Sequence, residues 1–412
     1  MNLRNILIGF LSLLFISAQA VPQDQLEISI DVQRHSERLL TLNVQGEVNI
    51  VALNSKKGIV VFDTSVSPVL ARLVRERIEE EFDSEKFAYV INTHFHGDHT
   101  YGNQVFSDVP IIGHESCADD MQEREQGRKN SLPAYKAAVE RMKAGLEKMD
   151  KDSAAAKELS RRIGYYQAMN AGLGEGFVLT PPTQTFSDSL SLDLGDITLE
   201  LIFFGISHSP SDILIYCPEE GMWITGDLIA ADYDSYIDSE RVPYLPRWIN
   251  NLKRIISTEE KTQIVVPGHG EFLSFDELKG ELDFIMDAKA AFDGKESAFT
   301  VFKETFNDSD LETALKELRD MKAQEDKYYV LFPEIDQYAY GMMLDDKLDE
   351  ALDIFKVMVD LFPDSDTAFD SLGEVYMRKE KTEMAIASFK KSLELNPDNR
   401  NASAKLKALQ KK

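Results

Sequence analysis

Four side chains of types that commonly bind metal ions stand close together in residues 93–100, Thr-His-Phe-His-Gly-Asp-His-Thr. They are His94, His96, Asp98 and His99, and they include three of the seven histidines of the chain. Imidazole and carboxylate groups together suit zinc or a similar divalent cation. A turn after a strand lets His94 and His96 face one ion while Asp98 and His99 face a second. The cluster therefore predicts a metal site rather than a solvated polar loop.

Three further residues of the same chemistry each follow a predicted strand. His208 follows residues 199–204, Asp227 follows residues 222–225, and His269 follows residues 263–266. Side chains at the ends of several strands converge on one edge of a sheet, where α/β architectures place their sites. We therefore expect all seven side chains to share one site.

The complete series, H-x-H-x-D-H followed by His, Asp and His, resembles the metallo-β-lactamase-fold hydrolase superfamily over roughly residues 28–275. The resemblance implies a four-layer αββα sandwich, of α+β or α/β class, with a dinuclear zinc site. It also implies two ligand sets that share one residue: His94, His96 and His208 for the first ion, Asp98, His99 and His269 for the second, and Asp227 bridging both.

The resemblance carries two further roles and a mechanism. Asp63, in the strand that ends Val-Phe-Asp-Thr, matches a family position that supports the metal loop. A hydroxide held between two zinc ions has its pKa lowered toward neutrality and attacks a carbonyl, phosphoryl or sulfuryl centre. Asp98 is the catalytic residue that orients this hydroxide and moves its proton. Because an acidic residue at the position of His96 would indicate the di-iron oxidoreductase branch, we expect a hydrolase.

The expected cofactor is Zn²⁺ at two ions per chain, although Asp and His ligands also tolerate Mn or Fe. True β-lactamases of the first subclass carry Cys at the position of Asp227, and those of the third subclass usually carry Ser there. We therefore expect a small substrate with an ester-, lactone- or amide-type bond. Hydrolysis of a β-lactam ring is the alternative.

The region after Asp227 holds four candidate substrate contacts, because the family binds substrate there: Tyr233, Tyr236, Arg241 and Trp248. The alternative is that these residues pack in the core or lie at the rim, since aromatic side chains near a helix start usually fill core. His114 is close to the metal loop in sequence. We expect it to be structural, because all seven ligand positions are already filled.

The elements that must position these residues follow from the hydrophobic pattern. Short β-rich runs from about residue 26 to 115, with a helical stretch at 68–82, predict an α/β layer arrangement. Residues 118–171 are typical of an inserted helical pair or trio, after which strands resume up to residue 266. We expect a catalytic domain over 21–275 and a helical connector over 276–330.

A repeat follows beyond residue 330. Shifting the chain by 34 residues superposes Ala351 on Ala385 and Phe355 on Phe389, which is the period of a tetratricopeptide repeat. We expect TPR-like repeats with a capping helix over 331–412. Such helices can bind a protein or peptide partner, self-associate or brace the catalytic domain, and a less favoured alternative makes the chain an interaction protein with a metal-stabilised scaffold domain.

Composition excludes several classes of protein. With 43% apolar residues among 412 and a net charge of -26, the chain can bury a sizeable core and is repelled by nucleic acid and by anionic membranes. The first twenty residues, with Arg4, an apolar run over 6–16 and Ala18-Gln19-Ala20, predict a cleaved signal peptide over 1–20. We therefore expect an exported protein, periplasmic or secreted, with no membrane contact after cleavage.

The chain has two cysteines, Cys117 and Cys217, which are too few for a disulfide framework and allow one bridge at most. Their sequence surroundings favour two small buried apolar side chains.

Overall fold

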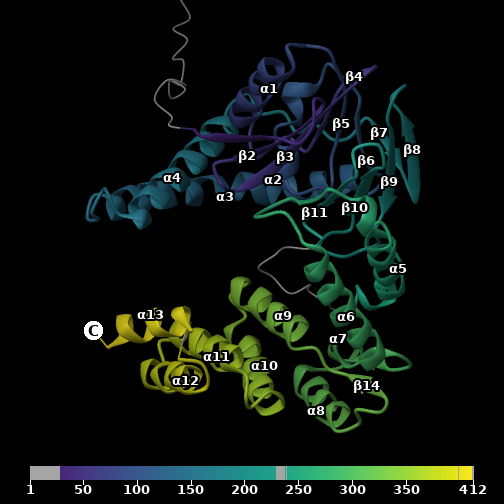
Figure 1. Ribbon diagram of the computed structural model, residues 1–412. Helices are drawn as coiled ribbons and strands as arrows, with labels where there is room; N and C mark the ends of the chain where they lie inside the picture. The colour runs from purple at the N-terminus through teal and green to yellow at the C-terminus, as the bar shows by residue number, and fades with distance from the viewer. Residues whose placement is uncertain (1–27, 229–236, 238, 398, 411–412) are drawn as a thin grey trace, which may run out of the picture. The chain divides into compact units, whose positions relative to one another are not determined.

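The structure is a computed structural model that describes residues 28–228, 237, 239–397 and 399–410 (Figure 1). The chain forms two compact units. The first comprises the residues up to Phe203 together with Ile213–Asp227 and Val266–Glu271, and the second comprises Phe204–Asp212, Leu228–Val265 and Phe272–Lys412. The predicted signal peptide lies outside the described residues.

A seven-stranded sheet forms the centre of the first unit, with its strands in chain order: β1 (Ile30–Arg34), β2 (Leu39–Val44), β3 (Val48–Ser55), β4 (Gly58–Phe62), β5 (Phe87–Ile91), β6 (Ile111–His114) and β7 (Gln184–Phe186). The strands from β1 to β4 are antiparallel, because short turns join them, whereas β4 to β7 are parallel and need longer connections. The parallel strands bring their carboxyl ends to one edge of the sheet.

Helix α1 (Pro68–Phe82) is the crossover between β4 and β5, as the sequence predicts. Ser67 caps its N-terminus by accepting from the backbone of Leu70, and a proline occupies the first turn. Leu70 and Val74, with Ile78 one turn on, bury an apolar stripe against the sheet.

Two helices fill the stretch in which the composition predicts a helical insertion. They are α3 (Cys117–Leu146) and α4 (Ala154–Gly172), which pack against each other (Figure 1). Helix α4 also packs on α1: Ala168 and Met169 join the core beneath the sheet, and a Cβ on Gly172 would lie 2.8 Å from that of Ser67. The insertion is therefore part of the core of the first unit.

A second sheet has five strands in the order β12-β11-β10-β9-β8: β8 (Ser189–Asp193), β9 (Thr198–Phe203), β10 (Ile213–Cys217), β11 (Met222–Gly226) and β12 (Ile264–Pro267). Strands β10 and β11 are buried along their whole length, whereas β8 alternates between exposed and half-buried residues. This pattern makes β10 and β11 central and β8 an edge strand.

The second unit is mainly helical. Its first elements are η3 (Val242–Tyr244), α5 (Leu245–Ile256), η4 (Glu259–Lys261), α6 (Phe275–Phe292), α7 (Ala298–Asp308) and α8 (Leu311–Lys322), with a short parallel pair of β13 (Glu296–Ser297) and β14 (Tyr328–Tyr329). The predicted dominance of helices after residue 275 is confirmed.

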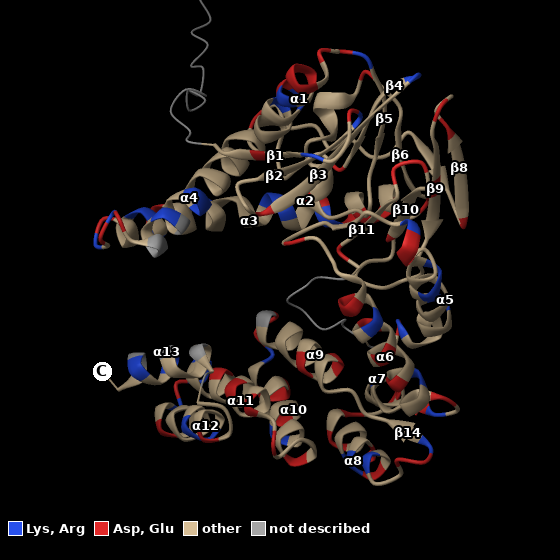
Figure 2. Ribbon diagram, in the orientation of Figure 1, with Lys and Arg blue, Asp and Glu red and all other residues tan. Residues whose placement is uncertain are grey.

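Five further helices follow with regular spacing: α9 (Phe332–Leu344), α10 (Leu348–Leu361), α11 (Asp366–Arg378), α12 (Thr382–Leu395) and α13 (Arg400–Leu409). Helices α9, α11 and α13 begin at residues 332, 366 and 400, which agrees with the 34-residue shift in the sequence. A Cβ on Gly373 would lie 2.6 Å from the Phe389 ring, so the small residue lets α11 and α12 approach. Figure 2 marks acidic residues in red along α9, α10, α11 and α12.

Three observations bear on the environment of the chain. Among the described residues, no helix is both long and apolar enough to cross a membrane. Cys117 and Cys217 are both buried and are not joined by a disulfide. Burial raises the pKa of Cys217 to about 12, against which hydrogen bonds to its sulfur act weakly, so this thiol behaves as a small apolar side chain.

A half-buried carboxyl group, that of Asp336, makes the stability of α9 and α11 depend on pH. Burial, together with the charge of Asp370, raises the pKa of Asp336 to about 6, although the Ser371 hydroxyl donates to it at 2.8 Å. Because the unfolded pKa is about 3.9, the folded state binds this proton more tightly. Ionisation of Asp336 therefore destabilises the folded protein. This effect grows as pH rises from about 4 to about 6 and is complete above about pH 6.

We expect Asp336→Asn, which keeps the oxygen that accepts from Ser371, to stabilise α9 and α11 at pH 7 by about 1–2 kcal/mol. The gain should vanish below about pH 4, because Asp336 is then protonated in both the folded and the unfolded protein. Amide hydrogen exchange in α9 and α11 at matched pH measures it. The exposed Asp364→Asn serves as the control and should change stability by less than about 0.5 kcal/mol. Equal protection of Asp336→Asn and the native protein at pH 7 would contradict this account.

Candidate metal centre

The metal loop follows β5 at the edge where the parallel strands end. The chain passes from β5 through Asn92 and Thr93 into the short helix α2 (Gly97–Thr100), with His96 at its N-terminal cap. Strand β4 runs parallel to β5, so Asp63, directly after β4, lies beside Thr93. The strand order alone therefore brings Asp63 under the histidine loop.

Asp63 is buried and accepts three hydrogen bonds. The backbone N–H of Thr93 donates at 2.8 Å, the Thr93 hydroxyl at 2.7 Å, and Nδ1 of His99 at 2.8 Å. Because the Thr93 hydroxyl donates its only hydrogen to Asp63, its oxygen must accept from Nδ1 of His94, 3.1 Å away. One carboxylate thus fixes the tautomers of His94 and His99, so that the Nε2 atom of each is available for the site.

His269 is also oriented by a hydrogen bond at its Nδ1 atom. It follows β12, and its Nδ1 donates to the carbonyl of Glu47 in the turn between β2 and β3. Asn49 holds the His269 turn by donating from its side chain to the carbonyls of Pro267 and Gly270, both at 3.0 Å. The Nε2 atom of His269 therefore also faces the site.

Two glycines let the strand ends of the two sheets approach each other closely. Gly226 has a positive φ of 55°, and a Cβ there would lie 2.9 Å from the Thr93 side chain. A Cβ on Gly268 would overlap Oδ1 of Asp227 and lie 2.9 Å from the His99 ring. Only a residue without a side chain allows the carboxylate of Asp227 to sit between the histidines.

The three Nε2 atoms and the two carboxylates converge at short range. His269 Nε2 lies 3.2 Å from an oxygen of Asp98 and 3.2 Å from one of Asp227. His99 Nε2 lies 3.4 Å from Asp227, and His94 Nε2 lies 3.6 Å from it. Potential ligand atoms lie within 4.8 Å of one another in two groups, which include His94, His96 and Asp227 in one and Asp98, His99 and His269 in the other.

The electrostatics are those of a site that holds positive charge. Burial lowers the pKa of His99, but the carboxylates of Asp227, Asp98 and Asp63 outweigh burial and raise it well above its usual value. Burial likewise opposes charge on His269, yet hydrogen bonds to Asp227 and Asp98 raise its pKa to about 10. Burial raises the pKa values of Asp98 and Asp227, but the charge of His99, together with the charges and hydrogen bonds of the neighbouring histidines, outweighs burial and lowers both pKa values.

The donor set fits a divalent cation. Each of the three histidines gives Nδ1 to a hydrogen bond inside the protein and turns Nε2 toward carboxylate oxygens, the arrangement that ligating histidines generally show. Nitrogen and carboxylate ligands suit zinc, and a cation would take the place of the protons that the imidazoles otherwise hold. The residues of the first unit can therefore hold metal.

The remaining predicted site residues are placed as follows. His208 lies in the second unit, on the loop of residues 204–212 that connects β9 to β10. Tyr233 and Tyr236 lie outside the described residues. Arg241 and Trp248 both donate to backbone carbonyls of the His208 loop. Trp248 is only 1% exposed, so the structure gives its indole a packing role, which the sequence leaves as the alternative to substrate contact.

His114 is a structural residue, as predicted. It is buried in β6, its two ring nitrogens interact with the Ser116 hydroxyl and the Ser187 carbonyl, and its ring stacks on Phe203 at 3.8 Å. Sequence reasoning missed Thr93 and Asn49, which orient the ligands. A polar Asn49 inside the apolar run Val48–Leu53 was the available signal.

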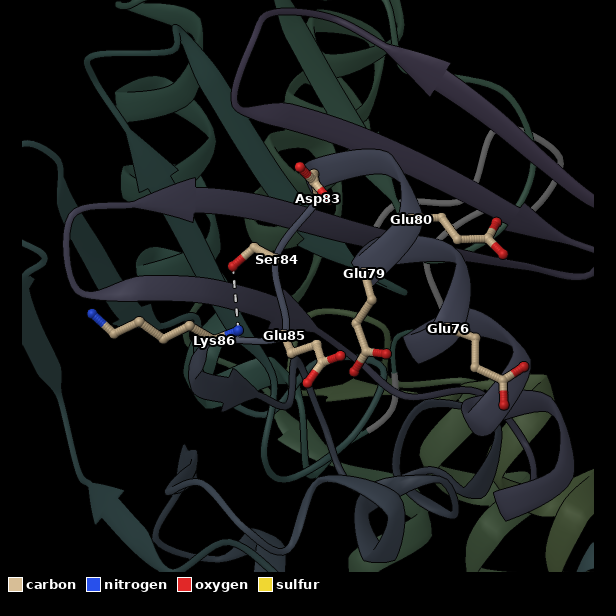
Figure 3. Close-up of a pocket in the computed structure, with 7 residues that line it drawn as sticks. All are labelled: Glu76, Glu79, Glu80, Asp83, Ser84, Glu85 and Lys86. Atoms are coloured by element: carbon tan, nitrogen blue, oxygen red, sulfur yellow. Dashed lines mark hydrogen bonds between the residues drawn. The ribbon is translucent and has the colours of Figure 1, made fainter.

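A pocket at the C-terminal end of α1 is a separate feature (Figure 3). Its lining is mainly acidic and contains no residue of the histidine cluster: Glu76, Glu79, Glu80, Asp83, Ser84, Glu85 and Lys86. It takes no part in the metal site.

Comparison with known proteins agrees with this geometry. A family model described as the metallo-beta-lactamase superfamily matches residues 44–332, which is more than half of the chain. The chain therefore belongs to the metallo-beta-lactamase superfamily, a family of hydrolases, and is an enzyme of that class. The fold and the family predicted from the histidine series are confirmed.

Individual relatives are distant. The chain is 20% identical over 223 residues to a metallo-beta-lactamase type 2 of Bacillus cereus, covering 54% of this chain and 67% of the relative. It is 23% identical over 274 residues to the 2,4-dinitroanisole O-demethylase subunit alpha of Nocardioides sp. (strain JS1661), covering 66% of each. A solved metallo-beta-lactamase from Pontibacter korlensis is 16% identical with a TM-score of 0.42, and the match covers 63% of this chain and all of that one.

We expect Gly268→Ala to weaken metal binding by roughly 10-fold to 100-fold, because the added methyl group displaces Asp227 and the His99 ring. Competition with a chromogenic chelator measures the affinity. Gly127→Ala in α3 is the matched control, since a Cβ there meets nothing within 4 Å. It should leave metal binding unchanged and stabilise the helix by roughly 0.5–1 kcal/mol. Native metal affinity in Gly268→Ala would show that the carboxylate does not need this space.

Proposed function

We propose that this protein is an exported, dinuclear zinc-dependent hydrolase that cleaves an ester-, lactone- or amide-type bond of a small substrate. The observation that carries this proposal is the set of three imidazoles whose Nδ1 atoms are held by Asp63, Thr93 and the Glu47 carbonyl. These hydrogen bonds turn all three Nε2 atoms toward two carboxylates. Titratable groups that are buried close together, with strongly shifted pKa values, are typical of functional sites.

The first ion would be held by His94, His96 and His208, and the second by Asp98, His99 and His269, with Asp227 serving both. The place of Asp227 supports the bridging role, because its Oδ2 lies 3.6 Å from Nε2 of His94 and 3.2 Å from Nε2 of His269, and its Oδ1 lies 3.4 Å from Nε2 of His99. His208 is proposed as a ligand from its position after a strand in the sequence, which it shares with Asp227 and His269.

The ions would supply a Lewis acid and a water that ionises near neutral pH. Asp98 is the carboxylate that water and substrate can reach, since its side chain is 32% exposed whereas that of Asp227 is 10% exposed. It lies 3.2 Å from His269 and 3.6 Å from His99, so its charged form is stabilised. Asp98 is therefore present as a carboxylate, which is the form that can accept a proton from water and return it to a leaving group. Zinc is the proposed metal, and the Asp and His ligands also tolerate Mn or Fe.

The alternative substrate class is a β-lactam. It is favoured by the relatives named metallo-beta-lactamase type 2, and it is opposed by Asp227, where β-lactamases of the first subclass carry Cys. An ester or lactone accords with this departure. The O-demethylase relative is named for a reaction on an aryl ether, 2,4-dinitroanisole. The family's chemistry is therefore wider than one bond type.

The C-terminal helices α9–α13 are proposed to be TPR-like repeats with a capping helix. Their 34-residue spacing and the contact of Gly373 with Phe389 support this assignment. They could bind a protein or peptide, join two copies or brace the catalytic part. A pure scaffold role for the whole chain is less well supported, because no member of the ligand series is missing. Export rests on the signal-like residues 1–20, which predict a periplasmic or secreted protein. The net charge of -26 argues separately against binding to nucleic acid or to anionic membranes.

We expect the zinc-loaded protein to bind two ions per chain and to hydrolyse at least one member of a panel of chromogenic lactones, esters, thioesters and β-lactams. Asp98→Ala should lower kcat by roughly 100-fold or more, because the proton transfer is lost. Removal of metal by a chelator should abolish turnover, and zinc should restore it.

The panel also separates the two substrate classes. Turnover of the β-lactam alone would place the alternative first, whereas turnover of lactones or esters with inert β-lactam would support the proposal. No bound metal after zinc loading would overturn the hydrolase mechanism as a whole.

A further inference from the structure

The loop that carries His208 is closed by its own hydrogen bonds. The backbone N–H of Phe204 donates to the carbonyl of Asp212 at 3.0 Å, which ties the two ends of the loop together. The N–H and the hydroxyl of Ser209 both donate to the buried Asp212 carboxylate, at 2.6 and 2.8 Å. These bonds fix the backbone after His208, at residues 209–212. The carbonyls of residues 206–208 need donors from other parts of the chain.

Two side chains that follow Asp227 in the sequence satisfy the carbonyls next to His208. The indole N–H of Trp248 donates to Ile206 at 3.1 Å. The guanidinium of Arg241 donates from Nε to Ser207 and from Nη2, at 3.4 Å, to His208 itself. A planar guanidinium that spans two successive carbonyls restricts the peptide that carries the ligand more than a single donor would.

The rest of α5 packs on the same loop. Asn251 donates to the Phe204 carbonyl at 3.4 Å, and the Trp248 ring stacks on Phe204 at 5.9 Å. Gly205 has a φ of 108°, and a Cβ there would lie 3.1 Å from the Tyr244 ring. The apolar face of α5 is therefore seated against the loop backbone.

The Arg241 segment is held in turn by the C-terminal helices. The backbone N–H of Ser239, two residues before Arg241, donates to the carboxylate of Glu334 in the first turn of α9. Glu334 is only 5% exposed, so this is a buried carboxylate that receives a backbone donor. Hydrogen bonds thus run from α9 through residues 239–241 to the carbonyls of Ser207 and His208.

We propose that Arg241 and Glu334 are positioning residues for His208, and that helix α9 acts through them on the loop that carries this ligand. The inference rests on the proposed role of His208 as a ligand. It assigns Arg241 to the loop rather than to the substrate, and it favours the brace among the possible roles of the repeats. Outer residues that orient ligands generally contribute about 10-fold to 100-fold to metal affinity.

Cobalt(II) substitution of the full-length protein tests the proposal, because the visible absorption of cobalt reports ligand geometry independently of turnover. His208→Ala is the benchmark: it should change the spectrum and weaken the binding of one of the two ions. Arg241→Ala and Glu334→Ala should each change the same spectral component and weaken the same ion by roughly 10-fold to 100-fold. Arg241→Lys, which keeps the charge but not the planar fork, covers the case in which Arg241→Ala fails to fold.

Two conservative variants and a control separate positioning from general damage. Glu334→Gln keeps the oxygen that accepts from Ser239 and should behave as the native protein. Trp248→Phe keeps the ring but loses the donor, and should show an intermediate loss. Glu383→Ala, an exposed residue in the first turn of α12, should change neither the spectrum nor the affinity.

The outcomes are distinguishable. An unchanged spectrum in His208→Ala would overturn the proposed ligand set. A changed spectrum in His208→Ala with native behaviour of Arg241→Lys, Arg241→Ala and Glu334→Ala would overturn the positioning role while leaving the ligand set intact. An effect of the Arg241 variants without one in Glu334→Ala would overturn the link to the C-terminal helices.

Discussion

The site depends on one buried carboxylate. Asp63 accepts from the backbone and hydroxyl of Thr93 and from His99, and through the Thr93 hydroxyl it also determines the tautomer of His94. A non-glycine residue with a φ of 63° is strained, and the three hydrogen bonds offset that strain. Without this anchor, each imidazole could present either nitrogen, and the convergence of Nε2 atoms would be lost.

The two sheets supply what the anchor cannot. Gly226 and Gly268 remove side chains where β11 and β12 end, and this space admits Asp227 between His99 and His269. The result places negative charge among imidazoles that take up protons when no cation is bound. Metal binding and the close approach of the sheets are therefore two aspects of one arrangement.

The clustering of His94, His96, Asp98, His99, Asp227 and His269 could be predicted from the sequence, because metal chemistry restricts both the types of such residues and their positions after strands. The 34-residue shift likewise predicted the spacing of α9 to α13, since paired helices need small and large residues at fixed offsets. The roles of Arg241 and Trp248 could not be predicted. Each donates to a backbone carbonyl more than thirty residues away in the sequence. Every residue has a backbone carbonyl, so the sequence does not show which one accepts the bond.

Anomalous diffraction at the zinc edge from crystals of the zinc-loaded protein tests the central claim most directly. The account predicts two zinc peaks roughly 3.5–4 Å apart, with Asp227 between them, His94 and His96 on one ion, and Asp98, His99 and His269 on the other. Zinc bound elsewhere, or an ordered site with Nδ1 rather than Nε2 of His94 and His99 on the metal, would contradict it.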